Sequence, residues 1–102
     1  MKIDKIDLRK LGATLAVDSD HALTTAPRGA VVLIRLAPQD NAYPEERHEA
    51  RENIVCLEGR LALVADGERV DLSQGECCRV PVGLAHRWSS ESNGLVLVHF
   101  GE

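Results

Sequence analysis

Residues 75–90 read Gly75-Glu76-Cys77-Cys78-Arg79-Val80-Pro81-Val82-Gly83-Leu84-Ala85-His86-Arg87-Trp88-Ser89-Ser90, and this stretch decides the fold. Gly75 is a turn residue, residues 77–80 predict a short strand, and Pro81-Val82-Gly83 predicts a reversal of the chain. A proline cannot donate a hydrogen bond to a strand ladder, so Pro81 belongs where strand pairing stops. A second short strand is expected to begin at His86.

Short strands separated by turn signals continue on both sides of this stretch. Asp66-Gly67 is a two-residue hairpin signal with a preference for a type I′ turn, and Ser92-Asn93-Gly94 predicts another turn. Short apolar or alternating runs predict strands over residues 30–36, 54–57, 60–65, 68–72, 77–80, 86–89 and 95–100. Many short strands with regularly spaced turn signals indicate an all-β sandwich or barrel.

Residues 1–28 are harder to interpret. Ile3, Ile6, Leu8 and Leu11 fit either an edge strand or a weak helix. Gly12 and the Asp18-Ser19-Asp20 cluster interrupt whichever element forms. His21 lies beyond that interruption without neighbouring ligand residues, so we interpret it as a surface or packing histidine.

Composition excludes several classes of function. A chain of 102 residues has room for one domain, and its net charge of −4 argues against a nucleic-acid surface. We find neither an apolar run long enough to span a membrane nor the apolar segment of a secretory signal. Three cysteines cannot form a closed disulfide framework, and neighbours on a strand, such as Cys77 and Cys78, point to opposite faces. We therefore expect a reduced, cytoplasmic protein without membrane or nucleic-acid partners.

The opening stretch resembles the second signature of the cupin family, Gly-x5-Pro-x-Gly-x2-His-x3-Asn, with Ser90 in place of the asparagine. The chain is most similar to small single-domain cupins of the cupin-2 type, which are named for their likeness to mannose-6-phosphate isomerase. They share the segments Leu57-Glu58-Gly59-Arg60 and Val80-Pro81-Val82-Gly83-Leu84-Ala85-His86.

The resemblance implies a small cupin barrel (a double-stranded β-helix or jelly roll) that forms a homodimer. It covers residues 30–101 of a single domain 1–102, with residues 1–28 as an N-terminal arm or edge strands. In the family, the histidine that corresponds to His86 points into the barrel and usually binds a metal ion.

The first cupin signature, Gly-x5-His-x-His-x3or4-Glu-x6-Gly, is only partly present. Glu52 and Gly59 have the six-residue gap of the pattern, His48 takes the place of the second histidine, and the first histidine's place falls on Glu46. The opening glycine is missing. The implied metal ligands are thus Glu46, His48, Glu52 and His86. If four residues separate the second histidine position from Glu52, the two histidine positions fall instead on Glu45 and Arg47. Arg47 would repel a cation and favour a carboxylate or phosphate.

Spacing supports a shared site without the resemblance. Glu46, His48 and Glu52 differ by even numbers, so on a continuous strand their side chains face the same side. A loop or bulge there would break this arrangement, and the segment also fits an ordinary charged, solvated loop. Two imidazoles with one or two carboxylates suit a divalent ion such as Fe, Mn, Ni or Zn.

Four further residues are candidates for the pocket. Trp88 shares the face of His86 and either lines the pocket or fills the core. Cys56 shares the face of Glu52, and we interpret it as a small buried hydrophobe. Arg79 would bind an anionic substrate if its guanidinium reaches the cavity, and otherwise lies on the surface. Tyr43 belongs either to the rim of the pocket or to the core.

Two main classes of function remain open, beside a third possibility, a stand-alone remnant with an interaction role. The first is a metal-dependent enzyme that performs oxygenation, isomerisation or a lyase reaction on a small polar organic molecule or sugar. The second is a metal-free module that binds a small molecule without chemistry of its own. The fold does not choose between them.

Overall fold

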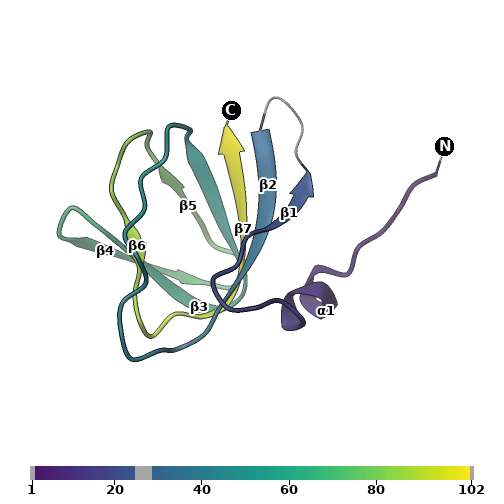
Figure 1. The fold of residues 1–102 in the computed structure, drawn as a ribbon, viewed down its shortest axis with the longest axis horizontal. Coiled ribbons are helices and arrows are strands. Elements are labelled where there is room, and N and C mark those ends of the chain that lie inside the picture. The colour runs from purple at the N-terminus through teal and green to yellow at the C-terminus, as the bar shows by residue number, and fades with distance from the viewer. Residues whose placement is uncertain (1, 25–28, 102) are drawn as a thin grey trace.

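The chain folds into a β-barrel with one short helix, as the computed structural model shows for residues 2–24 and 29–101 (Figure 1). The strands pair antiparallel in the order β1-β2-β7-β3-β4, and β5 and β6 also pair with β3. This confirms the predicted all-β class. The elements are α1 (Leu8–Ala13), β1 (His21–Thr24), β2 (Gly29–Leu36), β3 (Glu52–Ala65), β4 (Glu68–Ser73), β5 (Cys77–Val80), β6 (Arg87–Trp88) and β7 (Asn93–Gly101).

Strand β3 connects the two halves of the barrel. Its first half pairs with β5 and β7, and its second half pairs with β4 and β6. Gly59, where the sequence predicted a break between two strands, lies inside β3 with a φ of +83°. Next to it the register with β7 shifts between Cys56 and Glu58. A bulge of this kind bends a strand without ending it, so one strand serves both halves.

The core lies inside the barrel and follows the period-2 alternation of the strands. Alternate residues of β2, β3 and β7 point into the barrel, and some of their neighbours, namely Leu33, Ala62 and Leu95, are buried as well. The inward residues of these strands are Val32, Ile34, Leu36, Ile54, Cys56, Leu61, Leu63, Val96 and Val98.

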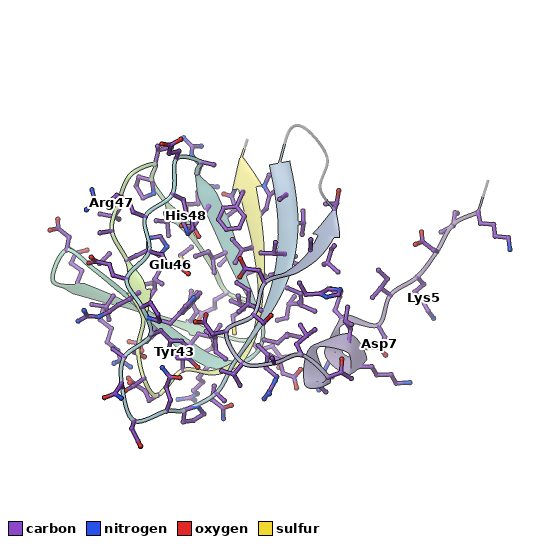
Figure 2. All side chains as sticks on the ribbon, viewed as in Figure 1. Lys5, Asp7, Tyr43, Glu46, Arg47 and His48 are labelled. Atoms are coloured by element: carbon purple, nitrogen blue, oxygen red, sulfur yellow. The ribbon has the colours of Figure 1, made fainter. Side chains whose placement is uncertain are left out.

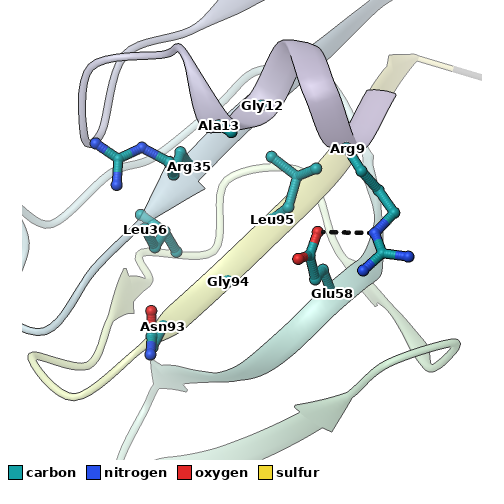
Figure 3. A pocket seen from close by; sticks show the side chains of 9 residues that line it. All are labelled: Arg9, Gly12, Ala13, Arg35, Leu36, Glu58, Asn93, Gly94 and Leu95. Atoms are coloured by element: carbon teal, nitrogen blue, oxygen red, sulfur yellow. Dashed lines mark hydrogen bonds and ion pairs between the residues drawn. The ribbon is translucent and has the colours of Figure 1, made fainter. Parts of the chain in front are cut away.

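Helix α1 packs on the outside of the barrel, next to β2. Asp7 caps its first turn by accepting a hydrogen bond from the Lys10 amide. Gly12 is buried against Leu95 of β7, where a Cβ atom would collide with the leucine side chain. Of the two elements that the sequence allowed here, the weak helix forms, although it excludes Ile3 and Ile6. A cavity of about 170 Å³ remains beneath it, beside an ion pair between Arg9 and Glu58 (Figure 3).

The strands predicted over residues 30–36, 68–72, 77–80 and 95–100 are confirmed within one residue or two. Asp66 and Gly67 both have positive φ, at +51° and +76°, as a type I′ turn requires. The turn predicted at 92–94 was wrong: it lies at Ser90-Glu91, because Asn93 and Gly94 already pair with β3. The strand predicted over 86–89 is reduced to Arg87–Trp88.

The N-terminal part contains β1, which begins at the exposed His21 and, among the residues that the structure describes, pairs with β2 at the edge of the sheet. Residues 1, 25–28 and 102 of the predicted domain lie outside the described residues. Within the described ranges, no helix has the length and apolar character needed to cross a bilayer.

Candidate metal centre

The segment that carries Glu46 and His48 runs antiparallel to residues 83–86. The Glu46 amide donates to the His86 carbonyl at 2.7 Å, and the His86 amide donates to the Glu46 carbonyl at 2.9 Å. The Gly83 amide donates to the His48 carbonyl, also at 2.9 Å. These bonds hold the segment of the first signature against the segment of the second signature.

Four titratable side chains meet at this point. The ligand atoms of Glu46, His48 and His86 all lie within 4.8 Å of one another, and His48 Nε2 is 3.4 Å from Glu46 Oε2. Glu52, the first residue of β3, places Oε1 3.7 Å from His48 Nε2 and Oε2 2.9 Å from His86 Nε2. The structure thus brings together all four residues that the resemblance implied as ligands.

Glu46, His48 and Glu52 come together although they do not lie on one continuous strand, as their spacing had suggested. The chain bends at residues 49–50, so Glu52 belongs to β3 while Glu46 and His48 belong to the segment before it. The even spacing of Glu46 and His48 still matters, because both lie on the segment paired with residues 83–86. Glu45 and Arg47, the alternative pair, line a different surface pocket, and Figure 2 shows Arg47 pointing away from His48.

The site runs from the barrel interior to the surface. The side chains of His86 and Glu52 are 3% and 5% exposed, whereas those of His48 and Glu46 are 31% and 47% exposed. The inner pair is therefore shielded from water, and Glu46 forms the solvent-facing side. A small molecule would approach the cluster from the side of Glu46 and His48.

Local contacts fix the ring of His86. Its Nδ1 lies 2.8 Å from the Leu84 carbonyl, and a carbonyl can only accept, so Nδ1 carries the proton and Nε2 faces Glu52. The adjacent Glu52 carboxylate raises the pKa of His86 above its usual value, and this outweighs the opposing effect of burial. Without a bound cation, the imidazolium form of His86 is thus the favoured partner of Glu52.

The arrangement of the inner pair, Glu52 and His86, also suits a bound metal ion. Glu52 Oε2 is buried and, although 2.9 Å from His86 Nε2, accepts no well-aligned hydrogen bond from the described residues. The His86 Nε2 atom is nevertheless close enough to Glu52 to raise the pKa of His86, so this buried oxygen can be balanced either by the His86 imidazolium or by a bound cation. A histidine whose Nδ1–H is bound to a carbonyl, with Nε2 turned to the site, is the usual arrangement of a metal ligand. The residues present therefore fit a divalent ion.

Phe100 also borders the site, although the sequence did not indicate it as a site residue. Its ring meets the His48 ring edge-on, with centroids 5.0 Å apart, and it pairs with Glu52 across β3 and β7. Phe100 shares the parity of the inward residues Val96 and Val98, so its face could be read from the sequence. Its position beside Glu52 could not, because that depends on the pairing of two distant strands.

Of the four candidate pocket residues, three lie in the core. Trp88 and Tyr43 are 6% and 3% exposed, and the Tyr43 hydroxyl donates to the Ala37 carbonyl at 2.6 Å. Cys56 is fully buried, with its thiol 3.5 Å from the Glu58 carbonyl. Arg79 is exposed, because it pairs with Asn53, whose side chain faces opposite to that of Glu52.

Comparison with known proteins agrees with this architecture. The chain is 34% identical over 90 residues to quercetin 2,3-dioxygenase from Bacillus subtilis, a match that covers 87% of this chain and 26% of that protein. The chain spans about a quarter of the length of the curated relatives that it matches.

Solved structures share the fold at low sequence identity. A cupin-2 domain protein from Shewanella frigidimarina superposes with a TM-score of 0.79 at 15% identity, covering 95% of this chain and 94% of that one. A proposed mannose-6-phosphate isomerase from Ralstonia eutropha gives 0.76 at 16%, covering 98% and 99%. Hydroquinone 1,2-dioxygenase from Sphingomonas, solved with 4-hydroxybenzoate bound, gives 0.77 at 14%, covering 100% and 81%.

The family assignment rests on the sequence as well as on the fold. The family profile described as the cupin domain matches residues 32–100, a range that includes His48, Glu52 and His86 and most of the barrel. The chain belongs to the cupin family.

Proposed function

We propose that this protein is a metal-dependent enzyme that acts on a small polar organic molecule. Glu46, His48, Glu52 and His86 would hold a divalent ion. The observation that carries the proposal is the buried Glu52 carboxylate, which lies against His86 Nε2 without an aligned donor of its own. A bound ion would supply Lewis-acid or oxygen-binding chemistry at this position.

The protein side chains would have distinct roles around the ion. Glu52 and His86 form the buried side, and the Leu84 carbonyl keeps His86 Nε2 directed to the site. Phe100 supports the ring of His48. Glu46 is the most exposed of the four, so it would serve as the fourth ligand or accept a proton from the substrate.

Oxygenation is the reaction class that we favour among those open to the fold. Two imidazoles with a carboxylate match the ligand composition of non-haem iron oxygenases. The sequence relative from Bacillus subtilis is a dioxygenase, and the Sphingomonas structure is a dioxygenase with a small aromatic acid bound. These two proteins support iron, or the chemically close manganese, as the first metals to test.

Metal analysis of matched variants tests the proposal. Protein purified without chelators should contain close to one equivalent of a transition metal, and His48→Ala should lose most of it. Arg47→Ala is the matched control, since Arg47 is adjacent and exposed yet lines a different pocket, and it should keep the metal. A parent protein that holds far less than one equivalent, even after incubation with Fe(II) or Mn(II), would refute the proposal.

A second function, a metal-free binding module, has one observation in its favour. The raised pKa of His86 allows its imidazolium form to neutralise Glu52, so the buried pair does not require a metal to fold. This function predicts that 4-hydroxybenzoate, and not divalent ions, raises the melting temperature. A rise with Mn(II) that disappears in His48→Ala would decide for the enzyme.

A further inference from the structure

A groove with an apolar floor opens through the side of the barrel, between the β3–β4 hairpin and β5, which lie away from β1 (Figure 1). It has a volume of about 280 Å³. Because β4 pairs with the second half of β3 and β5 pairs with the first half, the bend of β3 separates β4 from β5. Residues that strand alternation directs into the barrel thus line an opening to solvent. They are Leu63, Val70, Cys78, Val80 and Leu84.

The floor of this groove adjoins the buried side of the candidate metal centre. Val80 is buried and lies directly opposite Glu52 in the β3–β5 ladder, so both side chains point into the barrel. The carbonyl of Leu84, another floor residue, lies 2.8 Å from His86 Nδ1. Val80 and Leu84 therefore separate the groove from the two buried members of the cluster.

The floor suits a neutral and apolar molecule. Its residues other than Cys78 are aliphatic, and burial raises the pKa of the Cys78 thiol, which keeps that side chain uncharged. The charged residues that line the groove, Asp66, Glu68 and Arg79, are exposed. A polar organic molecule would lose its hydration on this floor and gain no charged or hydroxyl partner there. Dioxygen is apolar and pays no such cost.

Two entrances suit a reaction between an organic molecule and dioxygen. An organic substrate bound on the exposed side of Glu46 and His48 would cover that side of the cluster. On the groove side, Val80 and Leu63 are each 4% exposed, so the floor is closed to a molecule of that size. A diatomic molecule can pass between packed aliphatic side chains when they change rotamer.

We propose that dioxygen reaches the buried side of the metal centre through this groove, between Val80 and Leu84, while the organic substrate occupies the side of Glu46 and His48. The inference rests on the oxygenation proposed above. Val70 lies at the mouth of the groove, where it is 43% exposed. A larger side chain at this position narrows the entrance without entering the core.

Quenching of tryptophan fluorescence by dissolved oxygen tests access through the groove. Trp88 is the only tryptophan of the chain, is 6% exposed and pairs with Leu63 of the floor. Val70→Phe should lower the quenching rate constant for oxygen at least about threefold, because the ring fills the entrance. Val82→Phe is the matched control, since Val82 is 60% exposed and lines a different pocket. A rate constant unchanged in Val70→Phe, or lowered equally in Val82→Phe, would overturn the proposal.

A charged quencher tests whether the route selects for an apolar molecule. Iodide should quench Trp88 at least about tenfold more slowly than oxygen, because an ion loses its hydration on the apolar floor. Iodide quenching as fast as oxygen quenching would mean that water reaches Trp88 freely, and it would contradict an apolar route.

Methyl NMR under pressurised oxygen locates the gas in the parent protein and needs no variant. Dissolved oxygen is paramagnetic, so it speeds the relaxation of the methyl groups that it approaches. The methyl groups of Val80 and Leu63, each 4% exposed, should show at least about threefold more enhancement than those of Val98 and Leu36, at 2% and 1%. The two pairs are similarly buried, so depth alone predicts similar values. Equal enhancement in both pairs would overturn the proposed route.

Both measurements use metal-free protein, so they separate the route from the reaction. A parent that binds one equivalent of Fe(II) but shows no preference for the groove would overturn the route and leave the proposed enzyme standing. A parent that binds no Fe(II) would refute the proposed function, and with it the role of the groove, whatever the oxygen measurements show. The Val70→Phe variant should bind Fe(II) as the parent does, because Val70 is not among the proposed ligands.

Discussion

Glu46 and His86 face each other across two reciprocal backbone hydrogen bonds, although 40 positions separate them in the chain (86 − 46). The main chain, and not the side chains alone, therefore sets the distance between the first and the last of the proposed ligands. This isolated bridge replaces the strand that the spacing of Glu46, His48 and Glu52 suggested.

The bridge gives a direct test of the register of the first signature. Glu46→Gln should lower the affinity for Mn(II) at least about tenfold in calorimetric titrations, since even the loss of an outer-shell partner of a metal ligand costs 10–100-fold. Glu45→Gln removes the same charge from the neighbouring residue, which lines another pocket, and should leave the affinity unchanged. Equal losses in both variants would show that general charge, and not coordination, attracts the ion.

The buried pair should contribute to stability in the metal-free protein. His86→Ala leaves the Glu52 carboxylate buried without its positive partner, and breaking such a pair costs about 3–5 kcal/mol. Urea denaturation in the presence of a chelator measures this loss. His21→Ala, at an exposed position of β1, should cost well under 1 kcal/mol. A His86→Ala variant as stable as that control would contradict a stabilising ion pair between His86 and Glu52.

The same pair makes the stability of the metal-free protein depend on pH. Glu52 raises the pKa of His86 in the folded protein. The contribution of the His86–Glu52 pair to stability is therefore fully present below the pKa of His86 in the unfolded chain, about 6.5. It is lost as the pH rises through the higher pKa of His86 in the folded protein. The unfolding free energy should fall across that window in the parent protein, and this fall should be absent in Glu52→Gln. Metal affinity should change in the opposite direction, since the metal requires His86 to release its proton. Melting curves at a series of pH values, with and without Mn(II), measure both effects.

Gly59 should be essential to the bend of β3. It has a φ of +83°, and a Cβ atom there would collide with the Asn93 carbonyl and lie 2.8 Å from Gly94 Cα. We expect Gly59→Ala to cost about 3 kcal/mol or more, because the strain of the backbone adds to the collision. Gly67→Ala has a similar φ of +76° but open space around the Cβ position, so it should cost only about 1–2 kcal/mol. Equal losses in chemical denaturation would mean that the collision is relieved by a shift of β7.

The three thiols should react in the order of their burial. Burial raises the pKa of Cys56 and of Cys78 and keeps both thiols protonated, while Cys77 is exposed. Iodoacetamide at pH 8 should therefore modify Cys77 first, Cys78 slowly and Cys56 only after unfolding. Peptide mass spectrometry follows the three sites. Rapid modification of Cys56 under native conditions would contradict the burial of this part of the core.

Local signals in the sequence predicted much of this structure. Pro81 and Gly83 stop one strand and start the approach to His86, and Asp66-Gly67 forms the predicted turn, because these residue types restrict the backbone without help from distant contacts. The even spacing of Glu46 and His48 also predicted that their side chains lie on the same side of the chain. A paired segment alternates its side chains even outside a long strand.

What the sequence did not predict depends on pairing across the barrel. Nothing near Phe100 indicates that β7 will place it beside Glu52. The continuity of β3 through Gly59 was missed for the same reason, because only its partners on β7 show that the chain bends there and does not turn. Helix α1 has six residues, too few for a clear helical pattern, and it is held by its packing against the barrel.

Strand β3 begins with a proposed ligand and then takes four different partners along its length. Most of these partners are distant in sequence, so Glu52 reaches its final position only when the barrel has closed on both sides. The cluster of proposed ligands therefore forms only when the complete fold has formed, and we do not expect it in a fragment of the chain. A bound ion would therefore indicate that the whole barrel is folded. A mutation that opens the barrel should release the ion before helix α1 detaches from the barrel.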